Sequence, residues 1–186
     1  MLQRGGLLYP CYCSRARLQA IGAPHAGERS VYDGHCYGMT AAERAAMQKD
    51  PSWRVHVPAA AVSFCDGVYG RQEAYLPRAC GDFVVRRADG LYAYQLAVSV
   101  DDGMMGITHV LRGRDLLSST AQQIWLIEYL GYPAPQYTHV PMLIDGEGHR
   151  LSKRQQGITI ESLRDGGATA TACCPIWLTK AGWYPK

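Results

Sequence analysis

Residues 142–154 bring together the side chains best suited to chemistry in this chain. An apolar, strand-like run enters a turn with two glycines within three residues, and the turn delivers Ser152, Lys153 and Arg154 together. Glycine lets the backbone turn where side chains would obstruct it, while lysine and arginine supply a flexible and a planar cationic donor. Such a loop is suited to holding phosphate. A solvated hairpin tip is the competing interpretation, so the rest of the chain must decide.

Cysteine is the second source of chemistry in the sequence. There are 7 cysteines, an odd number, and Cys11 and Cys13 stand only two positions apart. This spacing argues against a disulfide framework and favours reduced thiols, with a metal site as a further possibility. We therefore expect no structural disulfides.

Composition restricts the class of the protein only weakly. Of 186 residues, 47% are hydrophobic and 19% are charged, so the chain can bury a core as one large domain or two small ones. The formal net charge of +3 permits an anionic partner but does not demonstrate nucleic-acid binding. The amino terminus has no long apolar segment, and no run approaches membrane-spanning length. We expect a cytoplasmic protein that has no membrane contact.

Capping residues predict two short helices in the first third of the chain. Ser14 can cap a helix that runs through Ile21. The spacing Thr40-Ala-Ala-Glu43 is that of a capping box, and a helical stretch from Arg44 to Lys49 follows it. Between these helices, residues 23–38 show no periodicity and need something to order them.

Alternation and apolar runs predict a mixed sheet in the middle of the chain. The expected strands are Trp53–Val57, Val62–Phe64 with a turn at Asp66–Gly67, a hairpin of Asp82–Arg87 and Leu91–Val100, and Ile107–Arg112. The second hairpin strand is apolar nearly throughout, as a buried strand would be. Helical patterns are expected over Ser119–Leu130, Ile160–Arg164 and Ala168–Trp183.

Three long blocks, in the correct order, carry a resemblance to a known family. They are Gly81–Asp102, Gly106–Leu117 and Arg150–Arg154. The chain resembles the glutamyl-tRNA synthetase group of class I aminoacyl-tRNA synthetases, and within it the glutamyl-Q tRNA(Asp) synthetases. The resemblance implies an α/β protein: a partial class I synthetase Rossmann-type nucleotide fold with an inserted zinc-containing α+β subdomain.

The resemblance also gives the basic loop a role. Residues 150–154 would be a variant of the family's KMSKS loop, with Lys153 as the catalytic lysine that contacts ATP. The implied ATP-binding residues are Arg150, Leu151, Ser152, Lys153 and Arg154. Cations at this place stabilise negative charge that develops on the phosphates. ATP is then a substrate, accompanied by Mg²⁺.

By the same resemblance, Tyr94 and Arg112 would bind glutamate, from the second hairpin strand and the end of the next strand. An arginine can grip a carboxylate with two parallel bonds, and a tyrosine hydroxyl adds a directional one. Without the family, the simpler interpretation is a core aromatic and a surface arginine.

The resemblance further implies that Cys11, Cys13, Tyr32 and Cys36 are zinc ligands. Thiolates are good zinc ligands, and a metal would order the aperiodic segment between them. On coordination chemistry alone, His35 competes with Tyr32 for the fourth position. We follow the family and choose Tyr32, with zinc in a structural role.

Other candidate residues receive simpler interpretations. Cysteines that match no ligand spacing are expected to be small packing residues: Cys65, Cys80, Cys173 and Cys174. Asp101 and Asp102 are expected at a solvated strand end or turn, because no further carboxylate pair accompanies them.

The sequence also departs from the family pattern. No HIGH-type motif precedes Leu7, so we expect that the chain begins within the catalytic domain and that the isolated chain is incompetent. The expected divisions are residues 1–80 with the zinc-containing subdomain and linking strands, 81–165 with the second half of the nucleotide fold, and a helical segment over 166–186. Only 186 − 154 = 32 residues follow the basic loop, which favours the glutamyl-Q branch.

The resemblance implies that the complete enzyme, expected to be a monomer, activates glutamate with ATP and releases pyrophosphate. It then transfers the glutamyl group to queuosine in the anticodon of tRNA(Asp). Alternatives are a truncated glutamyl-tRNA synthetase, a non-catalytic zinc-containing RNA-binding remnant, and an inactive product that folds poorly.

Overall fold

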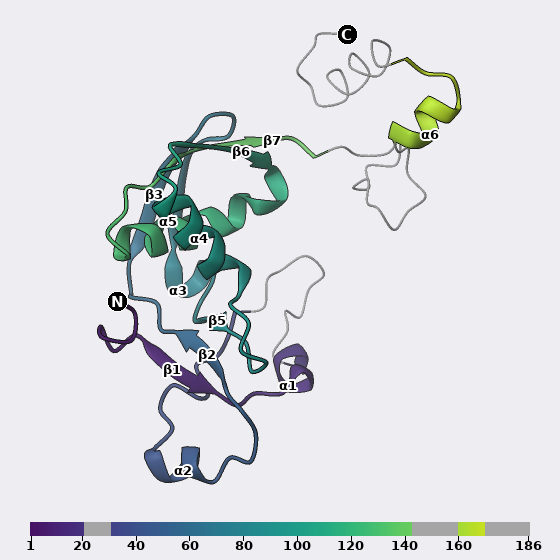
Figure 1. The fold of residues 1–186 in the computed structure, drawn as a ribbon. Helices are drawn as coiled ribbons and strands as arrows, with labels where there is room; N and C mark the ends of the chain where they lie inside the picture. Colours follow the sequence, from purple (N-terminus) through teal and green to yellow (C-terminus); the bar gives the residue numbers. More distant parts are fainter. Residues whose placement is uncertain (21–30, 143–159, 170–186) are drawn as a thin grey trace. The chain divides into compact units, whose positions relative to one another are not determined.

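The computed structural model describes residues 1–20, 31–142 and 160–169 (Figure 1). The chain divides into two compact units, each described by itself below. The first comprises Met1–Val110 and Ser118–Tyr137, and the second comprises Leu111–Leu117 and Thr138–Lys186. The scheme expected from the sequence, with divisions after residues 80 and 165, stays a prediction.

Strands and short helices alternate along the described chain, as expected for a mixed α/β protein (Figure 1). The strands are β1 (Leu8–Cys11), β2 (Ser52–Val55), β3 (Ala61–Asp66), β4 (Gly70–Tyr75), β5 (Phe83–Arg86), β6 (His109–Gly113) and β7 (Gln136–Val140). The α-helices are α1 (Arg15–Ala20), α2 (Ala41–Ala45), α3 (Leu76–Ala79), α4 (Tyr94–Met104), α5 (Leu117–Tyr129) and α6 (Ile160–Asp165), with a 3-10 turn at Arg114–Leu116.

The first sheet has three strands in the order β1-β2-β5, all antiparallel. Its register pairs Leu8 with Val55 and Val55 with Phe83, so Val55 lies at the centre. Val55 is fully buried and packs in a core cluster with Val85 of β5 and Leu126 of α5. This sheet carries β1 and therefore the first cysteines of the candidate metal site.

The second sheet has four strands in the order β4-β3-β7-β6. β3 and β4 form an antiparallel hairpin, while β3 and β7 pair in parallel through Asp66 and Tyr137. The hairpin turn is fixed by Asp66, whose carboxylate accepts the backbone N–H groups of Val68 and Tyr69 at 3.0 and 2.9 Å. The predicted turn and the predicted mixed sheet are thus both confirmed.

The predicted strand over Leu91–Val100 is wrong, because this segment forms helix α4. Only Tyr92 retains strand-like pairing, as an isolated bridge to Arg86. Within α4, Leu96 packs on the core and Ser99, three residues later, is fully buried, so one helical face points inward. A short apolar run does not distinguish a buried strand from a buried helix, which explains the error.

Two consequences follow for the residues carried by α4. Tyr94 begins this helix rather than lying in a hairpin strand. Asp101 and Asp102 belong to the last turns of this helix, so the prediction of a strand end or turn is wrong for them. Helix α4 is tied to α5 by Gln123, which donates a hydrogen bond of 2.6 Å to Gln95.

The other helices agree with the sequence to varying degrees. Helix α5 matches the predicted Ser119–Leu130 helix, and α6 matches Ile160–Arg164. The capping box of Thr40 and Glu43 is present, but α2 ends at Ala45, short of the predicted Lys49. The Arg17 N–H donates to Ser14 Oγ at 3.1 Å, as the cap prediction requires. The predicted helix over 168–183 lies almost entirely outside the described residues.

Within the described ranges, none of the helices has both the length and the apolar character that crossing a membrane requires.

Candidate functional site

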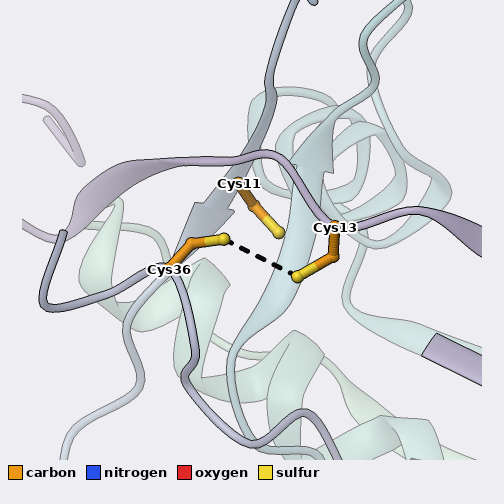
Figure 2. Close-up of side chains that lie close together, drawn as sticks. All are labelled: Cys11, Cys13 and Cys36. Carbon is orange, nitrogen blue, oxygen red and sulfur yellow. Dashed lines mark hydrogen bonds between the residues drawn. The ribbon is translucent and has the colours of Figure 1, made fainter. Parts of the chain in front are cut away.

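Three cysteines converge at the end of β1, within the first unit (Figure 2). Cys11 is the last residue of β1, Cys13 follows it, and Cys36 comes from the segment before α2. Their three Sγ atoms all lie within 4.8 Å of one another, and the Cys13 and Cys36 sulfurs are 3.6 Å apart. The side chains point toward one another in Figure 2, so the geometry allows a shared ligand.

Tyr32 lies against this cysteine cluster. Its hydroxyl oxygen is 3.5 Å from Cys11 Sγ and 3.4 Å from Cys13 Sγ. In a tetrahedral zinc site, bond lengths of about 2.3 Å to sulfur and 2.0 Å to oxygen place sulfurs about 3.8 Å apart and sulfur and oxygen about 3.5 Å apart. The donor set and its spacing therefore fit zinc.

The position of His35 differs from that of Tyr32. His35 is exposed, and its backbone N–H donates to Asp33 at 3.2 Å. Among the histidine, cysteine and acidic side chains of the described residues, the group close enough to share a metal contains only the three cysteines. The geometry thus favours Tyr32 as the fourth donor.

Two glycines allow the ligand-bearing segment to reach β1. Gly34, at a φ of 75°, turns the chain between Tyr32 and Cys36, and the N–H of Tyr37 donates to its carbonyl at 2.7 Å. Gly81 has a φ of 56°, and a Cβ there would come within 2.5 Å of Val31. A larger residue at either position would be strained by its backbone conformation.

Each thiol also receives an N–H group from outside the cluster. Arg54 Nε donates to Cys11 at 3.3 Å, Arg17 Nη1 to Cys13 at 3.8 Å, and the backbone N–H of Tyr12 to Cys36 at 3.4 Å. Such donors orient metal ligands and stabilise negative charge on sulfur.

Arg54 contacts both Cys11 and Tyr32. It is buried, its guanidinium carbon lies 3.8 Å from the centroid of the Tyr32 ring, and its Nη1 donates to the carbonyl of Asp82 at 2.7 Å. One side chain of β2 therefore contacts two of the four candidate ligands and is anchored to the residue that precedes β5.

The pKa values of the thiols differ because their surroundings differ. Burial raises the pKa of Cys11, but hydrogen bonds with Tyr32, the Cys13 backbone and Arg54 outweigh it and lower that pKa to about 7. Burial, together with the neighbouring thiols, raises the pKa of Cys13 to about 11. Burial and the three cysteines also raise the pKa of Tyr32. A bound metal cation would favour the deprotonated forms of these ligands.

A buried carboxylate, which the sequence did not reveal as important, supports this site. Asp82 accepts hydrogen bonds from the Tyr9 hydroxyl at 2.7 Å and the Val57 N–H at 3.0 Å, and His56 Nδ1 lies 3.1 Å away. Burial, followed by the hydrogen bond to Asp82, raises the pKa of Tyr9. Asp82 thereby joins β1, the end of β2 and the start of β5.

The two residues expected to bind glutamate lie in different units. Tyr94, in the first unit, is 56% exposed, which excludes the core-aromatic interpretation. Arg112, in the second unit, is half-buried on β6, and its Nε donates to Nε2 of His139 at 2.9 Å. It is therefore more than a surface arginine. Sequence reasoning missed His139.

The remaining candidates fall into two groups. The whole ATP-binding set, residues 150–154, lies outside the described residues, as do Cys173 and Cys174. The five described cysteines are free thiols. Cys80 is half-buried and donates to the Leu76 carbonyl at 3.3 Å, in keeping with a packing role. Cys65 is exposed on β3, so the packing prediction is wrong for it.

Comparison with known proteins identifies the family. The model of the catalytic domain of class I tRNA synthetases for glutamate and glutamine matches residues 1–186. The chain belongs to this family. As a class I synthetase catalytic domain, it has the mixed α/β architecture described above, and the expected resemblance is confirmed.

Two curated relatives of the chain are both named glutamyl-Q tRNA(Asp) synthetase. It is 49% identical over 174 residues to the glutamyl-Q tRNA(Asp) synthetase of Symbiobacterium thermophilum, covering 90% of this chain and 54% of that protein. It is 43% identical over 185 residues to the protein of the same name from Nitratidesulfovibrio vulgaris, covering 97% of this chain and 57% of that protein. The chain thus spans about half the length of these relatives.

Solved structures show the same fold. A glutamate tRNA ligase from Elizabethkingia meningosepticum superimposes with a TM-score of 0.67 at 24% identity, over 82% of this chain and 33% of that chain. The glutamate-tRNA synthetase from Elizabethkingia anophelis gives a TM-score of 0.65 at 25% identity, over 80% of this chain and 32% of that one.

Proposed function

We propose that the chain provides part of an enzyme that activates glutamate with ATP and transfers the glutamyl group to queuosine in the anticodon of tRNA(Asp). The observation that carries this proposal is the 43–49% identity to glutamyl-Q tRNA(Asp) synthetases over most of the chain. A truncated glutamyl-tRNA synthetase is not better supported, because these relatives carry the glutamyl-Q name. The reaction takes place in the cytoplasm, with Mg²⁺ accompanying ATP.

In this proposal, one group of residues contacts the phosphates of ATP and another binds glutamate. Lys153, with Ser152 and the rest of residues 150–154, stabilises charge on the phosphates when the glutamate carboxylate attacks. Tyr94 and Arg112 orient glutamate, Tyr94 with its exposed hydroxyl and Arg112 with its guanidinium. Adenylate formation depends on positioning and electrostatics more than on a protein nucleophile.

Cys11, Cys13, Tyr32 and Cys36 hold zinc in a structural role. The support is the spacing of the four donor atoms and the three N–H groups directed at the sulfurs. Bound zinc supplies a cross-link between the end of β1 and the segment that precedes α2. Residues 21–30, which connect α1 to that segment, lie outside the described residues.

The metal proposal has a direct test. Metal analysis of the purified chain should give about one zinc per chain, the stoichiometry of one four-ligand site. Cys36→Ser should lose it, whereas Cys65→Ser, which alters an exposed cysteine outside the cluster, should keep it. A stably folded wild-type chain that is purified without chelator and contains no metal would contradict the proposal.

The activation step is tested by glutamate-dependent exchange of pyrophosphate into ATP. In a full-length version of the enzyme, Lys153→Ala should reduce the exchange rate by more than roughly tenfold, the scale of losing one charge-assisted contact at a transition state. Arg71→Ala, which removes an exposed cation of the β3–β4 hairpin, is the matched control and should not change it. A zinc-containing RNA-binding module would instead bind tRNA and show no exchange.

A further inference from the structure

Arg112 is held by a histidine from the neighbouring strand of the second sheet. Its Nε donates to Nε2 of His139 at 2.9 Å, and its Nη2 lies 3.5 Å from the Leu116 carbonyl oxygen. Arg112 comes from β6 and His139 from β7, which are adjacent in the strand order. All three residues belong to the second unit, so the contact is internal to one compact body.

The chemistry of this pair fixes the state of the histidine. A guanidinium has only donors, so Nε2 of His139 must supply a lone pair. The imidazole is then neutral and carries its proton on Nδ1. His139 has an exposed fraction of 0%, so water does not compete for this contact. A buried acceptor of this kind restricts the rotation of the Arg112 side chain.

The contact also determines which edge of the arginine can grip a carboxylate. A guanidinium offers two edges for a pair of parallel bonds, one formed by Nε and a terminal nitrogen and one formed by the two terminal nitrogens. His139 accepts from Nε and the Leu116 carbonyl accepts from Nη2, the terminal nitrogen on the same side, so both contacts use the first edge. A carboxylate that Arg112 holds by two bonds must use the second edge, which sets the direction of approach.

We propose that His139 is a positioning residue for substrate recognition, which directs the terminal nitrogens of Arg112 toward a carboxylate of glutamate. This inference rests on the proposed function, in which Arg112 binds glutamate. His139 itself does not touch the substrate. Removing its acceptor leaves the charge of Arg112 in place but releases the guanidinium from its fixed orientation, so affinity for glutamate falls while ATP recognition is unaffected.

Two substitutions in a full-length version of the enzyme separate this role from simple packing. His139→Leu fills similar space without an acceptor, and His139→Gln places an amide oxygen near the position of Nε2. In glutamate-dependent pyrophosphate exchange, His139→Leu should raise KM for glutamate at least roughly tenfold, with KM for ATP within about twofold. His139→Gln should restore KM for glutamate to within about threefold of wild type. Thermal unfolding checks that both variants fold.

Equal KM values for glutamate in both variants and the wild type would overturn the inference, as would equal losses in both. If the full-length wild-type enzyme shows no glutamate-dependent exchange, the proposed function fails, and the substrate role of His139 fails with it. The hydrogen bond between Arg112 and His139 is tested separately by nitrogen-15 NMR of the wild-type chain. The spectrum should show that Nε2 of His139 is unprotonated and that Nδ1 is protonated. A proton on Nε2 would overturn the inference even if the variants do not fold.

Discussion

Arg54 donates its Nε–H to the sulfur of Cys11 across 3.3 Å. The same guanidinium covers the ring of Tyr32 and anchors to the backbone of Asp82. A planar cation with several donors can satisfy all three contacts, whereas a lysine ammonium cannot. The candidate metal centre thus depends on a residue that is not among its ligands.

Arg54→Lys should therefore weaken zinc binding by about 10–100-fold, the usual effect of losing a partner that orients a ligand. Competition with a chromogenic chelator measures the affinity. Arg87→Lys is the matched control, because Arg87 is exposed and forms an ion pair with the nearby Asp89. Equal affinities for wild type and Arg54→Lys would show that Arg54 does not support the centre.

Asp82 is expected to stabilise the first sheet through the hydrogen bonds that it accepts. Asp82→Asn replaces one acceptor oxygen by a donor beside Tyr9 and Val57, and should lower the free energy of unfolding by about 2–4 kcal/mol. Urea unfolding measures this difference. Glu73→Gln, at an exposed ion pair of 3.9 Å, should change the free energy by less than about 0.5 kcal/mol. Similar losses in both variants would argue against a special role for Asp82.

The metal-free chain should show a pH dependence set by its thiols. Cys11 has a folded-state pKa of about 7, below its ordinary value of 9.0, so the folded state binds fewer protons between these values. Its contribution to stability is present above about pH 9 and is lost as the pH falls through about 7. Cys13, with its pKa raised to about 11, acts in the opposite sense, and its contribution is lost as the pH rises from 9.0 through about 11.

Urea unfolding in the presence of a chelator, for wild type and Cys11→Ser, separates the two contributions. Wild-type stability relative to Cys11→Ser should rise between pH 7 and pH 9, because only the wild type gains a stabilised thiolate. A difference that stays constant over this interval would contradict the assigned lowering of the Cys11 pKa.

Local signals predicted several elements and the cysteine cluster from the sequence. The capping box at Thr40 and the helical spacing of α5 are short-range patterns, and both elements formed. The Cys-x-Cys spacing and the family resemblance anticipated a cluster that the structure brings together from residues 11–13 and 32–36. Such distant residues can be predicted together only when a family pattern links them.

The features that the sequence did not predict depend on contacts between segments distant in the chain. Helix α4 was mistaken for a strand because its buried face, marked by Leu96 and Ser99, is too short to distinguish helical from alternating periodicity. Asp82 and His139 act through contacts with strands distant in the chain. Neither residue lies in a motif whose spacing predicts a partner, so only the folded structure could reveal their roles.

The central proposal is that the chain is part of an enzyme that glutamylates queuosine in tRNA(Asp). Transfer of labelled glutamate to purified tRNA by a full-length version of the enzyme tests it most directly, with ATP and three acceptors: tRNA(Asp) containing queuosine, the same tRNA with guanosine at that position, and tRNA(Glu). We predict ATP-dependent labelling of the first alone, at a bond that survives removal of the terminal adenosine. Labelling of tRNA(Glu) at its terminal adenosine, with none on queuosine, would contradict the account.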